Sequence, residues 1–529
     1  MNGISTTGVG TSLRVQWRTG WKGASAWVIG LAAVVALTAG SITDLYDTPA
    51  KLRSYADSSD SPALRMLNGD VAGLGTLGGT LANELGFVFG FGLPVMAIAL
   101  TVRGTRREEE AGRLELLLAS RMGRQAPLVA AVLVALLSFL ALGALTAVIF
   151  VGSGTEVAGA LAFGGSIVAL GAVFVGVTAL LAQAFGHSRS VWGSGLAIML
   201  AAYIVRGAGA IDHTWVVWLS PHGWQDQVAA FGQLRWTPFV VSAVVTLALL
   251  GLALVLSARR DVGASLIAPS TGPERAAPAL LHPFGLAVRD RRGGILGWAV
   301  LVAILMGTYG SLTQTVIDAV QGNPDLAAFL AGGEEGIVKS MSAMFVLLLS
   351  MLVSGSVLQS LGSLRTEETS GRLELALSAP RGRVAWLLPH LGVVAVGTLV
   401  VAVVGSLALA LTTAAALGDS EWVGTLLRAG ADHLPVALLL GGLSVALFGW
   451  LPRLQPVVWA VFAIAAVVGY MGPGLDLPEA LVEWSPFGLV GNVPAESLDV
   501  TGALVAGGLG LLLVVLGLLG FVRRDVPHA

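Results

Sequence analysis

The sequence contains no cysteine and very little charge. Only 12% of its 529 residues are Asp, Glu, Lys or Arg, whereas 55% are hydrophobic. Without cysteine the chain can form neither disulfides nor thiolate metal sites. A soluble chain of this length would need roughly 25% charged residues to cover its surface, so the composition excludes a soluble globular protein. The formal net charge of −2 also gives no indication of nucleic-acid binding.

Lysine is scarce as well, and this bears on ATP hydrolysis. The phosphate-binding loop GxxxxGK[ST] requires a glycine immediately before its lysine, because its glycines expose backbone N–H groups to the phosphates. None of the three lysines in the sequence follows a glycine: Lys22, Lys51 and Lys339. We therefore predict no catalytic residue, cofactor site or metal site in this chain, and no ATP hydrolysis by it.

Long apolar runs make up most of the remaining sequence. A membrane-spanning helix needs about 20 mostly apolar residues, and isolated strands cannot satisfy their backbone in lipid. The sequence therefore predicts an all-α polytopic membrane protein. Its twelve candidate spans lie near residues 24–42, 80–102, 126–150, 159–184, 190–206, 237–257, 295–315, 340–361, 385–411, 434–450, 455–472 and 500–521.

The few charged residues are distributed unevenly between the loops. If the N-terminus is placed inside and the spans alternate, 23 of the 30 Lys and Arg residues fall on the inner side. Of the 32 Asp and Glu residues, 21 fall outside. Basic residues gather on the cytoplasmic side of membrane proteins, so we expect both termini to be cytoplasmic.

The densest charge in the sequence occurs twice. EEEAGRLELLLASRMGR (108–124) recurs as EETSGRLELALSAPRGR (367–383), and 11 of 19 positions are identical between 106–124 and 365–383. RRDV also recurs, directly after the sixth and the twelfth span. These repeats predict two tandem six-span halves, related by an axis along the membrane normal. The predicted domains are a first half, a cytoplasmic linker and a second half: 1–262, 263–283 and 284–529.

Each half opens with a basic and aromatic segment. In SLRVQWRTGWKG (12–23), Trp17 and Trp21 lie four residues apart, with two arginines and a lysine beside them. This pattern is typical of a helix lying in the membrane interface, and equally of a positively charged flank on the first span. The sequence leaves both interpretations open.

The repeated charged segment lies between the second and third spans of each half and predicts a short amphipathic helix. Glu109 and Arg113, and likewise Glu368 and Arg372, have the i,i+4 spacing of pairs that support exposed helices. A solvated loop is the alternative. However, exposed leucines require a partner surface, and the two copies agree here although the flanking spans have diverged. The leucines form a predicted stripe of Leu114 and Leu118 in the first copy, and of Leu373 and Leu377 in the second.

EEEAGRLELLLA and EETSGRLELALS resemble the EExxGxLExLL segment of type-2 ABC exporter permeases. The layout of the whole chain resembles the actinobacterial permeases that export polyketide antibiotics, the tetronasin type. The resemblance implies that 108–120 and 367–379 are coupling helices that dock on a separate ATPase in a bacterial plasma membrane. It implies two ATPase subunits per chain, which would bind ATP and Mg. The coupling residues implied are Glu108, Glu109, Arg113, Leu114, Glu115, Leu118, Glu367, Glu368, Arg372, Leu373, Glu374 and Leu377.

The same resemblance implies a substrate pathway along the second and fifth spans of each half. Aromatic and methionine side chains there suit hydrophobic drugs, polyketides or lipid-like molecules. The family also places a re-entrant extracellular element before the sixth span, where WLSPHGWQDQV (218–228) and WSPFGLVGNVP (484–494) stand. The candidate lining residues are Phe87, Phe91, Met96, Trp192, Met199, Tyr203, Met341, Phe345, Met351, Trp459, Phe462 and Tyr470.

Two other classes of function are compatible with the sequence. A secondary transporter of the major facilitator type also has twelve spans in two halves, and RDRRGG (289–294) resembles its basic loop. That segment precedes the seventh span, however, which is the wrong place for it. Ion-coupled carriers also usually carry ionisable groups inside the membrane, and no charge falls securely at the midplane. A membrane scaffold without transport activity would not explain the paired amphipathic segments.

Overall fold

The chain folds into two compact units of helices. The computed structural model describes residues 5–525, apart from 60–61, 120–121, 268–274, 315–316, 318–332, 379–381 and 472–477. The division falls between Met1–Gly272, which we call unit 1, and Pro273–Ala529, which we call unit 2. All regular secondary structure in the described residues is helical, which confirms the predicted all-α class.

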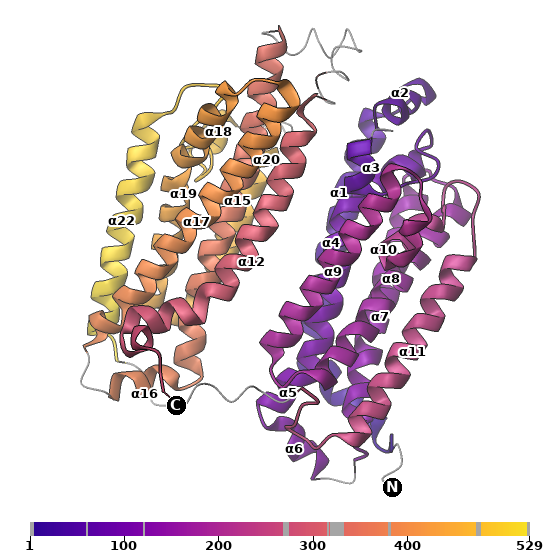
Figure 1. The fold of residues 1–529 in the computed structure, drawn as a ribbon, viewed down its shortest axis with the longest axis horizontal. Helices are drawn as coiled ribbons and strands as arrows, with labels where there is room; N and C mark the ends of the chain where they lie inside the picture. The colour runs from indigo at the N-terminus through magenta and orange to yellow at the C-terminus, as the bar shows by residue number, and fades with distance from the viewer. Residues whose placement is uncertain are drawn as a thin grey trace. The chain divides into compact units, whose positions relative to one another are not determined.

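Unit 1 is a bundle of long helices with short helices at its ends (Figure 1). The short helices α5 and α6 lie at one end of this bundle, and α2 lies at the other. The long helices are α1 (Val9–Leu45), α4 (Leu77–Gly104), α7 (Ala126–Gly152), α8 (Val157–Ala184), α9 (Ser188–Ile211) and α11 (Thr237–Arg259). The short ones are α2 (Pro49–Ser59), α3 (Pro62–Asn68), α5 (Arg106–Glu110), α6 (Arg113–Leu118), η1 (Trp215–Leu219) and α10 (Pro221–Gln227).

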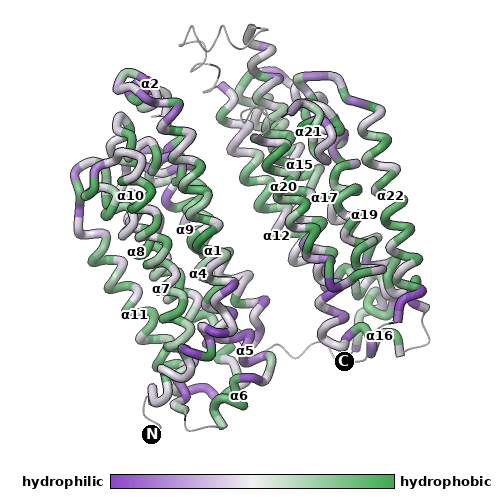
Figure 2. The backbone as a smooth tube through the Cα atoms, turned by 180° about the vertical axis from the view of Figure 1, so that it is seen from behind, coloured by the Kyte–Doolittle hydropathy of each residue, from purple (hydrophilic) through white to green (hydrophobic). Residues whose placement is uncertain are grey.

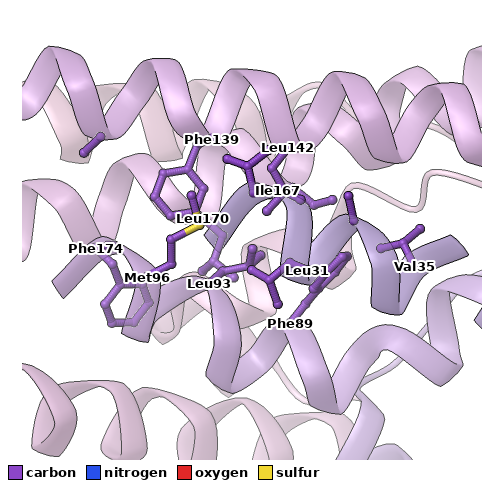
Figure 3. Close-up of a cluster of buried hydrophobic side chains, with 14 of the residues drawn as sticks. Leu31, Val35, Phe89, Leu93, Met96, Phe139, Leu142, Ile167, Leu170 and Phe174 are labelled. Carbon is purple, nitrogen blue, oxygen red and sulfur yellow. The ribbon is translucent and has the colours of Figure 1, made fainter. Parts of the chain in front are cut away.

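Apolar side chains from α1, α4, α7 and α8 form the core of unit 1 (Figure 3). Helix α7 packs against α1 and α8, and α8 packs against α4 and α11. Phe139 and Leu142 of α7 meet Leu170 of α8, and all three are fully buried. Lipid gives little hydrophobic driving force between helices, so close packing of this kind is what holds such a bundle together.

Unit 2 is a second helical bundle, with α16 at one end and α18 toward the other (Figure 1). Its long helices are α12 (Pro283–Ser311), α15 (Gly333–Thr369), α17 (Arg383–Leu417), α19 (Leu434–Trp450), α20 (Val457–Met471) and α22 (Val500–Arg523). Its short helices are η2 (Pro278–Leu281), α16 (Arg372–Ser378), α18 (Glu421–Asp432), η3 (Pro452–Leu454) and α21 (Glu479–Glu483).

Helices α19 and α22 of unit 2 cross at glycines. A Cβ atom on Gly449 would lie 2.1 Å from the carbonyl oxygen of Gly517, so no side chain fits at this point. Small residues at helix crossings allow the two backbones to approach closely in lipid. At this crossing, the high glycine content of the sequence serves helix packing.

The predicted spans correspond to helices wherever the structure describes them. Eleven helices in the described part of the chain are long and apolar enough to cross a membrane. The predicted span 455–472 corresponds to α20, whose apolar stretch Val457–Tyr470 is shorter than those eleven. Within each unit, hydrophobic residues follow the middle of the helices and hydrophilic residues gather toward the ends (Figure 2).

The N-terminal segment is not a separate interfacial helix, so that interpretation is wrong. Helix α1 runs without interruption for 37 residues, and the basic residues lie in its first turns. At about 1.5 Å per residue such a helix is longer than the roughly 30 Å hydrocarbon layer. Its first turns therefore flank the span, and Trp17 and Trp21, each 47% exposed, stand there as interfacial aromatic residues do.

Candidate functional site

The repeated charged segment of unit 1 is bent at a glycine. Helix α5 ends at Glu110 and α6 begins at Arg113. Between them Gly112 adopts the left-handed conformation with φ 70°. Glycine enters this region without a steric penalty because it has no Cβ. A side chain at this position would strain the backbone, so the glycine fixes where the helix turns.

Unit 2 repeats the same bend. Helix α15 extends to Thr369, Gly371 has φ 72°, and α16 follows. The prediction of single helices over 108–120 and 367–379 is therefore wrong, because a left-handed residue interrupts each of them. The last residue of both predicted ranges lies outside the described residues.

The bend brings an arginine back onto the first glutamate of each copy. Arg113 donates from Nε and Nη2 to the two carboxylate oxygens of Glu108, at 2.7 and 2.8 Å. Arg372 donates to Glu367 in the same way, at 3.0 and 2.8 Å. These hydrogen bonds raise the pKa of Arg113 and of Arg372 above the ordinary value for arginine. Each bidentate pair spans its bend, although the arginines are 55% and 57% exposed.

The second glutamate of each copy pairs with the end of the last long helix of its unit. Arg260 donates from Nη1 and Nη2 to the carboxylate of Glu109, at 2.7 and 2.9 Å. Arg524 donates to Glu368 at 2.6 and 2.9 Å. The side chains of Glu109 and Glu368 are only 5% and 9% exposed. Each pair therefore joins two segments that are far apart in the sequence.

The ion pairs expected from helical spacing are wrong. Arg113 binds Glu108 and not Glu109, and Arg372 likewise binds the first glutamate of its copy and not Glu368. The i,i+4 contact requires an unbroken helix, and the glycine between the two partners breaks it. The second glutamate is thereby turned toward its own bundle.

The two buried pairs have different surroundings. In unit 1, Arg106 lies 2.8 Å from Glu109, and the backbone N–H of Gly263 donates to Glu109 at 2.7 Å. Arg260 also donates from Nε to Gln183 of α8 at 2.8 Å. In unit 2, the Arg524 guanidinium instead lies over two aromatic rings, those of Phe448 and Phe521, at 5.4 and 5.8 Å. The buried Glu–Arg pair occurs in both units, but the groups that contact it differ between them.

A third glutamate in unit 1 caps the fifth long helix. Ser188, the first residue of α9, donates to the Glu110 carboxylate from its backbone N–H at 2.8 Å and from its hydroxyl at 2.6 Å. A carboxylate here satisfies an orphan N–H group and the positive end of the helix dipole. The three consecutive glutamates thus bind α6, α11 and α9 in turn, and α5 is a junction between them.

The leucines of the repeated segment divide between two faces. Leu373 is buried, and Leu114, Leu118 and Leu377 are half-buried. In unit 1 the two predicted leucines line a small cavity that also contacts Arg260. The predicted stripe therefore faces its own bundle.

The outward face of the same segment carries a different leucine in each copy. Leu116 and Leu375 are 77% and 75% exposed. Glu115 and Glu374 are exposed beside them. The sequence did not single out these two leucines, although both belong to the repeated GRLEL motif, because helical spacing places the flanking leucines, and not these, on one stripe.

Three of the predicted pathway residues in unit 1 form an aromatic cluster. The ring of Phe91 lies 5.1 Å from that of Phe87 and 4.6 Å from that of Tyr203. Phe87 and Tyr203 are 6.5 Å apart. The remaining three lie elsewhere. Met96 is fully buried in the core beside Phe174 (Figure 3), Met199 is buried in the same core cluster, and Trp192 packs on a separate small cluster.

The predicted pathway residues of unit 2 fall into two groups. Phe345 is buried under Tyr309 of α12, with ring centroids 4.8 Å apart. Trp459 and Phe462 of α20 are 5.8 Å apart, and Trp459 lines a cavity between α15, α19 and α20. Met341 is half-buried, Met351 packs on the cluster around Leu358, and Tyr470 is 40% exposed.

Unit 1 also contains a buried polar group that sequence reasoning did not identify. His222 of α10 donates from Nε2 to the carbonyl oxygen of Gly90, near the middle of α4, at 2.8 Å. Arg206 of α9 pairs with Asp226 of α10 at 3.7 Å, and both side chains are buried. The signal was present in the sequence, since SPHG (220–223) in the first half corresponds to SPFG (485–488) in the second.

The long apolar helices define the class of this protein as a multi-pass membrane protein. The profile of the family described as "Multidrug efflux system permease Rv1217c, C-terminal domain" matches residues 9–256 and 280–522. The chain is also 30% identical over 531 residues to the multidrug efflux system permease protein Rv1217c of Mycobacterium tuberculosis (strain ATCC 25618 / H37Rv). That match covers 99% of this chain and 96% of the relative. The chain belongs to this family of multidrug efflux permeases.

Proposed function

We propose that this chain is the permease subunit of an ATP-driven type-2 ABC exporter and that separate ATPase subunits energise it. One observation carries the proposal. In each unit the bent segment is fixed to its own bundle by a buried Glu–Arg pair, while one leucine, Leu116 or Leu375, stays exposed. This is the arrangement expected of an element that receives force from another protein and passes it to the membrane helices.

The hydrogen bonds of α5 supply a route for that force. Glu109 joins α5 to the end of α11 through Arg260, and Glu110 joins it to the start of α9 through Ser188. Coupling between distant sites is carried by packed, rigid elements with two arrangements. Movement of α6 on the ATPase would therefore shift the ends of the fifth and sixth spans of unit 1 together.

The rest of the assignment follows from the charge distribution and the family resemblance. We place the chain in a bacterial plasma membrane with both termini in the cytoplasm, where ATP and Mg would be bound by the ATPase. The two coupling segments, 108–120 and 367–379, would each face one ATPase subunit. The corresponding domains are a first half, a linker and a second half: 1–262, 263–283 and 284–529.

The substrate that we propose is a hydrophobic drug, polyketide antibiotic or lipid-like molecule. The aromatic residues that we propose for the pathway are the half-buried Phe87 and Phe91, packed on Tyr203, in unit 1 and Phe345, stacked beneath Tyr309, in unit 2. Aromatic rings contribute a large contact area without demanding specific hydrogen bonds. Such surfaces suit a transporter of varied apolar compounds.

The proposal predicts a defined stoichiometry. One permease chain carries two coupling segments, so the purified complex should contain one copy of this chain, of mass 54.1 kDa, and two ATPase subunits. Native mass spectrometry of the complex measures this ratio directly. Two permease chains for each pair of ATPases would contradict the assignment of one coupling segment to each half.

The proposed pathway predicts altered drug handling in two variants. Phe91→Ala or Phe345→Ala should change drug-stimulated ATPase activity or resistance about two- to tenfold, because an aromatic contact contributes about 0.5–1.5 kcal/mol. Assembly with the ATPase should be unchanged. Leu247→Ala is the control, since Leu247 lies on α11 and is 70% exposed. If both phenylalanine variants handle every tested drug as the control does, the proposed lining is wrong.

A further inference from the structure

Unit 1 contains a large cavity at the end of the bundle where α5 and α6 lie. Its volume is about 720 Å³, and residues of α1, α4, α5, α6 and α7 line it. Three of these elements are long apolar helices. Apolar side chains form one part of the wall, among them Leu100 of α4 and Val134 of α7. The cavity therefore lies at the depth where a membrane helix passes from hydrocarbon to headgroups.

The polar part of the wall is strongly basic. Arg103, Arg107 and Arg113 line it against a single acidic residue, Glu108. Arg113 is paired with Glu108, and Arg103 donates to the carbonyl oxygens of Gly20 and Thr19 on α1. Among the residues that the structure describes, the exposed Arg107 side chain has no ion-pair or hydrogen-bond partner. Its charge is available to an anion.

Helix α1 places the opening of the cavity at the membrane interface. Gln16 and Thr19 of α1 line the cavity. On the exposed side of the same turns stand Trp17 and Trp21, each 47% exposed. Tryptophan is enriched at the level of lipid headgroups. This observation is independent of the arginines and indicates a lipid occupant.

Unit 2 lacks two of the three corresponding arginines, and keeps only Arg372 in place of Arg113. The repeat aligns residue 106 with residue 365, so Gly362 stands where Arg103 does and Thr366 stands where Arg107 does. The charges of Arg103 and Arg107 are therefore particular to unit 1 and are not a general consequence of the repeated segment.

We propose that this cavity binds the phosphate headgroup of an anionic phospholipid, with Arg107 and Arg103 facing the phosphate and the acyl chains lying along Leu100 and Val134. Basic pockets between membrane helices are known sites for anionic headgroups. The occupant is a lipid of the surrounding bilayer and not the transported drug, so the inference does not depend on the proposed export function.

The test is native mass spectrometry of the full chain in detergent, titrated separately with phosphatidylglycerol and phosphatidylcholine. Arg107→Gln should weaken phosphatidylglycerol binding about fivefold, and Arg103→Gln with Arg107→Gln should weaken it more than tenfold, since each basic residue near the surface contributes about one such factor. Arg107→Lys should retain most of the binding. Arg259→Gln is the matched control, because it removes one exposed charge at the end of α11 and lies outside the cavity.

Each possible result either supports or overturns the proposed lipid site. Selective loss of phosphatidylglycerol in the Arg107 variants, with unchanged phosphatidylcholine binding and an unaffected Arg259→Gln variant, supports the site. Equal binding of the two lipids, an equal loss in the Arg259→Gln control, or full retention of phosphatidylglycerol in the Arg107 and Arg103 variants overturns it. Displacement of phosphatidylglycerol by millimolar glycerol phosphate also overturns it, in favour of a soluble phosphate compound.

Discussion

Replacing both Leu116 and Leu375 with aspartate should release the ATPase subunits and abolish drug export, while the chain still inserts in the membrane. The two leucines are 77% and 75% exposed on α6 and α16 in the free chain. In the proposed complex they would be buried, and an unpaired charge buried in an apolar interface costs several kcal/mol. Because 1.4 kcal/mol corresponds to a factor of ten in affinity, we expect each interface to weaken more than a hundredfold. Co-purification of the ATPase, beside a transport assay, measures both effects.

Two comparisons make this result specific. Ile267→Asp is the control for an added charge, since Ile267 is 54% exposed after α11 and lies outside α6. Leu118→Asp with Leu377→Asp tests the opposite face, where the leucines pack against their own bundles. If the second pair released the ATPase and the first did not, the inward stripe would be the docking face, and our assignment of the outward leucines would be wrong.

The long helices could be predicted from the sequence because their signal is local. A run of apolar residues long enough to cross a bilayer has few alternatives to a helix, since lipid leaves backbone groups without partners. The weak case is α20, whose apolar stretch Val457–Tyr470 is short. Its neighbours in the bundle determine its place as much as its length does. The internal repeat could also be predicted from the sequence, because finding it requires only a comparison of the chain with itself.

The contacts of the candidate site could not be read from the same signals. The i,i+4 spacing of Glu109 and Arg113 predicts a pair only where the helix is continuous, and the left-handed Gly112 interrupts it. A glycine between two charged turns is itself a signal for such a break, and it recurs as Gly371. The true partner, Arg260, stands in the repeated RRDV motif, yet a contact across 151 residues has no local signature.

The contacts of the aromatic residues could also be predicted only in part. Phe87 and Phe91 lie on one face of α4 because they are four residues apart, and their rings are in contact. Tyr203 completes the cluster from another helix, α9, and its position depends on how α9 packs against α4. The burial of Phe345 beneath Tyr309 depends on such packing too. Periodicity determines which residues share a face, but not which other helix that face meets.

Removing both Glu109 and Glu368 should leave the ATPase bound and disconnect ATP hydrolysis from export. In Glu109→Ala with Glu368→Ala, the exposed leucines and the bends at the two glycines stay in place, so docking should persist. However, Arg260 and Arg524 would each be left as an unpaired, largely buried cation. Breaking a buried pair in this way costs about 3–5 kcal/mol. The ends of α11 and α22 would then no longer follow the bent segments.

The neighbouring glutamates supply a matched control. Glu108→Ala with Glu367→Ala also removes one carboxylate per unit, but from pairs whose arginines are 55% and 57% exposed. Exposed pairs contribute only about 0–1 kcal/mol, so this variant should retain most of its export. ATPase activity and drug export are measured together in reconstituted vesicles. If the two alanine pairs impair export equally, or if the Glu109 and Glu368 variant couples normally, the buried pairs do not transmit force. The bent segments would then act through docking alone.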